Sequence, residues 1–157
     1  MQPNLPTSVV KSIRRRVDPD EYRAIRQLWI AHSIAEDAHD IPGLMATLTE
    51  DCVYTVANTG TSWHGKPGAT KFYQQLLTAF PDIHFDLQNI VIGPQGVFEE
   101  AFATGTYQVQ WLDLPTPGGQ RLKFAVTILF PWSPRQRLFT GERIYFFMNS
   151  MALPESS

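Results

Sequence analysis

After Pro81 the sequence alternates between runs rich in β-branched and aromatic residues and segments rich in proline and glycine. Turns of this composition between β-rich runs of this length are typical of consecutive hairpins. We therefore expect a mostly antiparallel, strongly curved sheet in the second half of the chain. The expected strands are residues 83–92, 97–109, 121–130 and 138–147, with a long loop at 113–120.

The first half of the chain predicts helices. Apolar residues recur at helical spacing after Asp18, which is a plausible N-cap. Proline is tolerated in a first helical turn, so Asp40 and Pro42 indicate a second helix start. A third helix ends before Pro81. The expected helices are residues 19–38, 42–51 and 67–80, and one short strand is expected at 52–56. Together with the sheet they predict an α+β domain with three N-terminal helices packed on one face.

A chain of 157 residues, 43% of them hydrophobic, is long enough for one domain with a substantial core. We expect a flexible N-terminal segment at 1–17, a single domain at 18–150 and a C-terminal tail at 151–157. Thirteen basic and fifteen acidic residues give a net charge of −2, which argues against nucleic acid or an anionic membrane as partner. No window approaches the ~20 apolar residues of a spanning helix, so a cytoplasmic protein is expected.

The stretch HSIAEDAHD at the end of the first helix holds two histidines and three carboxylates in nine residues. At ~100° per residue, His32 and Glu36 continue the apolar stripe that contains Trp29. A face that is apolar at one end and polar at the other indicates the lining of a small-molecule pocket. The alternative is an i,i+4 pair that closes the rim of the core.

A metal site on this helix is not expected. His32, Glu36 and His39 nominally supply two histidines and a carboxylate. Seven residues of helix rise by ~10.5 Å, so one helix cannot wrap all three around one ion. We therefore predict no metal ion at this site.

A second candidate carboxylate lies in the last strand. In GERIYFF, alternation puts Glu142, Ile144 and Phe146 on one face. If this face lines the pocket, desolvation raises the pKa of the Glu142 carboxyl toward the range that acid–base catalysis needs. The alternative is an ion pair with an arginine at the sheet edge. Glu99 and Glu100 occupy opposite faces of one strand, and the sequence does not decide which points inward.

Aromatic residues on several elements fit a pocket for a flat or apolar ligand, although each one is equally compatible with plain core. The segment FAVTILFPW, residues 124–132, is apolar on both faces, which favours a homodimer formed sheet to sheet. The expected ligand-binding residues are Trp29, Tyr54, Phe72, Trp111, Phe124 and Phe146.

The chain resembles the SnoaL-like polyketide cyclases of the cone-shaped NTF2-like superfamily, over roughly residues 20–148. Five segments in this order carry the resemblance: AHDIPGLMATLTEDCVY, WHGKPGATKFY, AFPDIHFDL, ATGTY and GERIYF. The resemblance implies a cone whose cavity holds a small apolar molecule. It also implies a cofactor-free reaction in which a carboxylate removes a proton next to a carbonyl group.

On this resemblance Glu142 is the expected base, with Glu36 and His32 as a supporting pair. Tyr107 stands where such cyclases often carry histidine, and is the expected donor to the developing oxyanion. Phe147 stands where many of them carry aspartate, which favours a non-catalytic ligand-binding or dimerisation module as the alternative. An epoxide hydrolase is the third possibility.

Overall fold

The computed structural model describes residues 5–152, with residues 148–152 described by their backbone alone. Within these residues the chain forms four helices and six strands in an α+β arrangement. The helices are α1 (Thr7–Ile13), α2 (Pro19–Asp37), α3 (Ile41–Ala46) and α4 (Gly65–Ala79). The strands are β1 (Leu48–Val56), β2 (Thr61–His64), β3 (His84–Gly93), β4 (Gly96–Thr106), β5 (Arg121–Ser133) and β6 (Leu138–Ala152).

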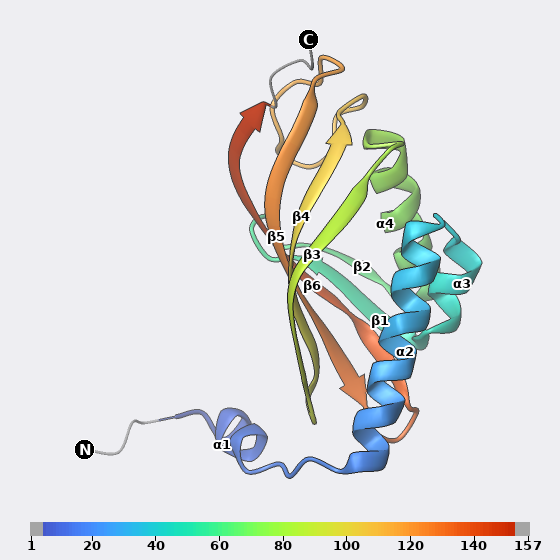
Figure 1. Ribbon diagram of the computed structural model, residues 1–157, viewed down its shortest axis with the longest axis vertical. Coiled ribbons are helices and arrows are strands. Elements are labelled where there is room, and N and C mark those ends of the chain that lie inside the picture. Colours follow the sequence, from blue (N-terminus) through green and yellow to red (C-terminus); the bar gives the residue numbers. More distant parts are fainter. Residues whose placement is uncertain (1–4, 153–157) are drawn as a thin grey trace.

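The six strands form one sheet in the order β2-β1-β6-β5-β4-β3. Each neighbouring pair is antiparallel except β1 and β6, which are parallel. Figure 1 shows a strongly bent sheet with α2, α3 and α4 on the same side. The expected class, helices packed on a curved and mostly antiparallel sheet, is confirmed.

Helix α2 begins as the sequence predicts. The Asp18 side chain accepts hydrogen bonds from the backbone N–H groups of Asp20 and Glu21, and Pro19 occupies the first turn. These contacts satisfy two donors that the helix itself leaves unpaired. The helix buries Ile25 and His32 under the sheet, so the polar stripe does continue the apolar one.

The segment between α2 and α4 differs from the prediction. Helix α3 ends at Ala46, and residues 48–51, expected to be helical, belong to β1. The reason is tertiary: Leu48 pairs with Phe139 of β6, a partner distant in the sequence. Strand β2 was missed because it is four residues long and only Trp63 in it is buried.

The two ends of the chain also differ from the expected boundaries. Within the segment expected to be flexible, α1 is a helix with no buried residue, and Gln95 Nε2 donates to the carbonyl of Ser12 at 2.9 Å. Strand β6 continues to Ala152, past the expected domain end at 150. Residues 1–4 and 153–157 lie outside the described part. None of the described helices combines the length and the apolar character that crossing a membrane requires.

Gly141 sets the position of the residue that follows it in β6. Its φ of 121° is a backbone conformation that residues with a side chain rarely adopt. A Cβ at this position would also overlap the carbonyl oxygen of Val53 in β1. The pairing of β1 with β6 shifts register between Leu48 and Val53, so Gly141 allows the two backbones to approach at this irregularity.

We expect Gly141→Ala to lower the free energy of unfolding by about 3 kcal/mol, because backbone strain and overpacking each cost roughly 1–3 kcal/mol. Urea unfolding measures the change. Gly60→Ala is the matched control, since Gly60 also has a positive φ (73°) but a Cβ there would meet no other atom within 4 Å. It should cost about 1 kcal/mol. Equal losses for the two variants would contradict the close approach at Gly141.

Candidate active site

Glu142 projects from β6 toward the helices. The side chains of Glu142, Ile144 and Phe146 are buried, whereas Arg143 and Phe147 are exposed. The predicted alternation is therefore confirmed, and Glu142 is only 3% exposed. The ion pair with a sheet-edge arginine does not form, because the partners of Glu142 lie inside the cone.

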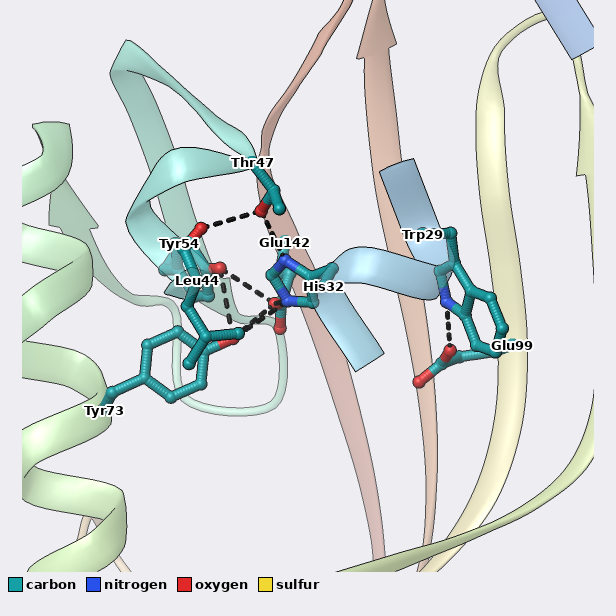
Figure 2. A network of polar contacts seen from close by, with 8 residues as sticks. All are labelled: Trp29, His32, Leu44, Thr47, Tyr54, Tyr73, Glu99 and Glu142. Carbon is teal, nitrogen blue, oxygen red and sulfur yellow. Dashed lines mark hydrogen bonds and ion pairs between the residues drawn. The ribbon is translucent and has the colours of Figure 1, made fainter. Parts of the chain in front are cut away.

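Three donors converge on one oxygen of Glu142. The hydroxyl groups of Tyr54 and Tyr73 each donate to Oε1 at 2.8 Å, and His32 Nε2 lies 3.0 Å from the same atom. These residues come from β1, α4 and α2, and Figure 2 shows them around the carboxylate. Burial and the Glu142 carboxylate raise the pKa of both tyrosines well above the ordinary value of 10, so both remain protonated donors.

The protonation of His32 follows from its other neighbour. The Thr47 hydroxyl donates to the carbonyl of Leu44 at 2.7 Å, so toward His32 Nδ1, also at 2.7 Å, its oxygen accepts. Nδ1 therefore carries a proton. Nε2 lies within hydrogen-bond distance of both Glu142 Oε1 (3.0 Å) and the Tyr73 hydroxyl (3.2 Å), and Thr47 fixes the orientation of the ring.

Glu36 lies one helical turn after His32. It is partly buried, and within the described residues its carboxyl group makes no hydrogen bond to the protein. His32, Glu36 and Glu142 each contribute one nitrogen or oxygen atom to a group in which these atoms lie within 4.8 Å of one another. Burial, followed by the Glu142 carboxylate, raises the pKa of Glu36 well above its ordinary value of 4.5. Both causes favour the neutral form of the Glu36 carboxyl group.

Glu99 completes the set of inward carboxyl groups. It is 5% exposed, whereas Glu100 on the opposite face is exposed, which resolves the question that the sequence left open. Its Oε2 accepts a hydrogen bond from Trp29 Nε1 at 2.8 Å (Figure 2). Burial raises the pKa of Glu99 from 4.5 to about 7, with a smaller contribution from Glu142 and an opposing one from the Trp29 hydrogen bond.

Two spaces adjoin these groups. A cavity of about 130 Å³ lies between α2 and strands β3 and β4, and is lined by Trp29, His32, Glu36 and Glu99 among others. An inner hollow of only about 10 Å³ is lined by Glu36, Glu142 and apolar side chains. Glu36 lines both spaces. The interior of the cone is thus almost filled by its own side chains.

The expected ligand-binding residues divide between these spaces and the core. Trp29 lines the cavity, and Phe72 and Phe146 line the inner hollow. Phe146 also lines an open depression of about 410 Å³ near the loop at Leu112. The other three are fully packed: Tyr54 belongs to the Glu142 network, and Trp111 and Phe124 each pack edge-on against Phe146 with ring centroids 5.4 Å apart.

Tyr107 lies away from the carboxyl groups. It is buried, its ring stacks on Phe80 at 4.9 Å, and its hydroxyl oxygen accepts a hydrogen bond from the backbone N–H of Trp111. Among the described residues no hydrogen bond joins Tyr107 to Glu142, Glu36 or His32. The geometry does not support the expected donor role of Tyr107.

The group formed by His32, Glu36 and Glu142 is also relevant to metal binding. From the sequence, His39 was the third possible metal ligand beside His32 and Glu36. In the structure His39 Nε2 instead lies 3.3 Å from the carbonyl oxygen of Ile83. Glu142 of β6 is the third residue of the group. Both ring nitrogens of His32 and one oxygen of Glu142 already have protein partners. A metal ion would have to displace these contacts. The expectation of a metal-free site stays a prediction.

The SnoaL-like domain family matches residues 28–132. The chain therefore belongs to the SnoaL-like family. No curated protein shows significant sequence similarity to it.

Solved structures agree with this assignment. A proposed polyketide cyclase from Pseudomonas putida KT2440 superimposes with a TM-score of 0.66 at 22% identity, over 82% of this chain and 95% of that one. An LEH-like epoxide hydrolase from M. tuberculosis gives 0.63 at 20% identity, over 85% and 89%. A hypothetical protein with a ketosteroid isomerase-like fold from Catenulispora acidiphila DSM 44928, in complex with trimethylamine, gives a TM-score of 0.63 at 15% identity, over 78% of this chain and 87% of that one. At these identities the likeness shows the fold.

The raised pKa of Glu99 has a consequence for stability. Between pH 4.5 and about 7 the folded protein keeps a proton that the unfolded chain releases, so the free energy of unfolding falls as pH rises through this window. The shift corresponds to at most about 3 kcal/mol. We expect Glu99→Gln to be more stable than the wild type at about pH 8 and similar to it at about pH 4, in urea unfolding.

Glu100→Gln is the control on the same strand, because Glu100 is exposed on the outer face. It should leave the pH dependence of unfolding unchanged. A Glu99→Gln variant that follows the wild-type pH dependence would show that Glu99 titrates normally in the folded protein.

Proposed function

We propose that this protein is a cofactor-free acid–base catalyst that moves a proton on the carbon next to a carbonyl group of a small molecule. One observation carries the proposal: Glu36 and Glu142 line the same inner hollow in different surroundings, since Glu142 accepts hydrogen bonds from Tyr54 and Tyr73, whereas Glu36 makes none within the described residues. Two carboxyl groups separated in this way are a common source of a paired acid and base.

Glu142 takes the role of base. Its Oε1 is held by Tyr54, Tyr73 and His32, while within the described residues its Oε2 accepts no hydrogen bond. The proton leaves the substrate carbon for Oε2, and the electron pair of the broken C–H bond forms the enolate. The hydrogen bonds of the two tyrosines and of His32 keep the carboxylate aligned with the hollow during this step.

Glu36 takes the role of acid. As a neutral carboxyl group it can donate a hydrogen bond to the substrate carbonyl oxygen, where negative charge develops. One of its oxygens lies within 4.8 Å of Glu142, and it has no competing hydrogen bond within the described residues, whereas the Tyr107 hydroxyl is bonded to Trp111. We therefore assign the donor role to Glu36 in place of Tyr107.

The size of the cavity limits the substrate. An apolar cavity of about 150 Å³ holds a benzene molecule in another protein. The 130 Å³ cavity therefore has room for a ketone or related carbonyl compound of similar size. Glu36 lines this cavity, whereas Glu142 lines the inner hollow and not the cavity, so the reacting carbon has to enter the hollow to reach the base. A fused-ring polyketide would require the packed interior around Phe72 and Phe146 to open.

The filled interior is the observation that favours a non-catalytic ligand-binding module as the second candidate. Phe147 does not add to that case, because its side chain is 57% exposed on the outer face, where an aspartate would not reach the hollow. An epoxide hydrolase relay of aspartate and arginine finds no support, since the buried charged residues of the described part are His32, Glu99 and Glu142.

The test is hydrogen exchange at the carbon next to the carbonyl group, followed by proton NMR in D₂O with a panel of small ketones such as butanone and cyclopentanone. This assay reports proton abstraction without knowledge of the product. We expect Glu142→Gln to lower the enzymatic exchange rate by at least about a hundredfold. Glu36→Gln should lose less than Glu36→Leu, because the amide retains a hydrogen-bond donor.

Glu100→Gln serves as the control with an exposed carboxylate and should exchange at the wild-type rate. If the Glu142→Gln variant exchanges at the wild-type rate, Glu142 is not the base. If no ketone exchanges faster with the wild-type protein than in buffer alone, the catalytic proposal is wrong and the non-catalytic ligand-binding module is the better candidate.

We also propose a homodimer formed through the outer face of the sheet. Phe98 and Phe147 are 44% and 57% exposed. Phe98 pairs with Leu129, and Leu129 with Arg143, so strand alternation puts Phe147 on the same face as Phe98. Exposed aromatic residues on one face of a sheet are a feature of protein interfaces.

Sedimentation velocity tests the dimer. The double change Phe98→Ser and Phe147→Ser should convert a concentration-dependent dimer into a monomer without loss of folding, since both side chains are exposed. Val109→Ser, at a residue 46% exposed in the loop after β4, should leave the dimer intact. A wild-type protein that sediments as a monomer at every concentration would contradict the proposal.

A further inference from the structure

The cavity between α2 and the sheet has walls of two chemical kinds. Trp29, Phe85 and Phe130 supply aromatic surface. Glu36, Glu99 and Asp37 supply carboxyl groups, of which Asp37 is exposed at the α2 side. Aromatic rings and carboxylates are both attractive to a positive charge, the rings through their electron-rich faces.

Positive charge is scarce around these carboxyl groups. Within the described residues His32 is the only buried basic side chain, and its Nε2 is already directed at Glu142. No lysine or arginine is among the described residues that line the cavity. Glu36 and Glu99 therefore lack a cation, and a buried carboxylate without one is unfavourable.

Glu99 offers an acceptor that the protein leaves unused. Its Oε2 accepts from Trp29, but within the described residues Oε1 accepts no hydrogen bond, although the residue is 5% exposed and lines the cavity. In Figure 2 one oxygen of Glu99 meets the indole of Trp29 and the other points away from it. This oxygen is therefore free to accept a hydrogen bond from a ligand in the cavity.

We propose that this cavity binds a small alkylammonium ion, with the positive charge beside Glu99 and Glu36 and the alkyl groups against Trp29, Phe85 and Phe130. The inference goes beyond the proposed function, because binding of the cation requires no proton transfer. The cavity of 130 Å³ accommodates a cation about the size of a tetramethylammonium ion.

The chemistry of the walls distinguishes this ligand from two others. A bare metal ion would contact the carboxylates but gain little from three aromatic side chains, and it prefers oxygen ligands on all sides. A neutral molecule of the same shape would use the aromatic surface but bring no positive charge to the carboxyl groups. Of these three ligands, the organic cation is the one that combines a positive charge with apolar groups.

Cation binding is coupled to the ionisation of Glu99. The pKa of Glu99 is raised to about 7, so below this pH the group is largely neutral, and a cation gains more from it as pH rises. The charged or titratable groups that face it are His32, Glu36 and Asp37 on α2 and Glu142 on β6; the lining residues of β3 and β5 are uncharged. Affinity should therefore increase between about pH 6 and about pH 8.

Isothermal titration calorimetry with tetramethylammonium chloride tests the inference. This ion has a permanent charge, so any pH dependence belongs to the protein. We expect saturable binding in a ratio of one to one and tighter binding at the higher pH. Near pH 7 we also expect proton release, seen as a dependence of the heat on the ionisation enthalpy of the buffer. tert-Butanol, a neutral molecule of similar shape, should bind at least about tenfold more weakly.

Glu99→Gln removes the charge and keeps an acceptor for Trp29. It should weaken tetramethylammonium binding about tenfold or more and abolish much of the pH dependence and proton release. Glu100→Gln, on the outer face of the same strand, should bind as the wild type does. Chemical shift changes of the Trp29 indole N–H in NMR locate the ligand.

Three results would overturn the inference: no binding of tetramethylammonium up to its solubility, equal affinity for tert-butanol, or full binding by Glu99→Gln. A fourth result would also overturn it. If magnesium chloride displaces tetramethylammonium but choline chloride at the same ionic strength does not, the site prefers a metal ion to an organic cation. None of these outcomes depends on ketone exchange, so this inference and the catalytic proposal fail separately.

Discussion

The buried carboxylate of Glu142 is the constraint around which the interior is organised. A single oxygen of this residue contacts Tyr54, Tyr73 and His32, and thereby connects β6 to β1, α4 and α2. A charge so far from water is tolerable only while its donors stay in place. Polar contacts of Glu142 therefore help to position β1, α4 and α2 relative to β6. The surrounding core is largely apolar and rich in aromatic residues.

Sequence rules that describe a single helix or strand identified some residues of the candidate site but not others. Strand alternation identified Glu142, and helical spacing put His32 and Glu36 on one face, because both rules describe a single element. Tyr73 and Thr47 were not found as members of the site, since their roles arise only when α4 and the end of α3 pack against α2. Glu99 was found only as one of two alternatives, since alternation gives two faces and does not say which is covered.

The errors in secondary structure have the same origin. Residues 48–51 were expected to continue a helix, but they pair with β6, so a contact distant in sequence overrides local preference. The short strand β2 is defined by its pairing with β1 and has little pattern of its own. The aromatic residues were the hardest to assign, because a packed core and a ligand pocket use the same side chains, and only the size of the remaining space separates them.

The parallel pairing of β1 with β6 has a consequence for the order in which the protein forms. Tyr54 lies opposite Glu142 in this pair, although the two are 88 residues apart in the chain. Contacts of such long range are slow to form, and a chain emerging from the ribosome has made α2, with His32, long before β6 exists. Until β6 docks, His32 and both tyrosines lack their common acceptor. The completed site is thus a product of the final stage of folding.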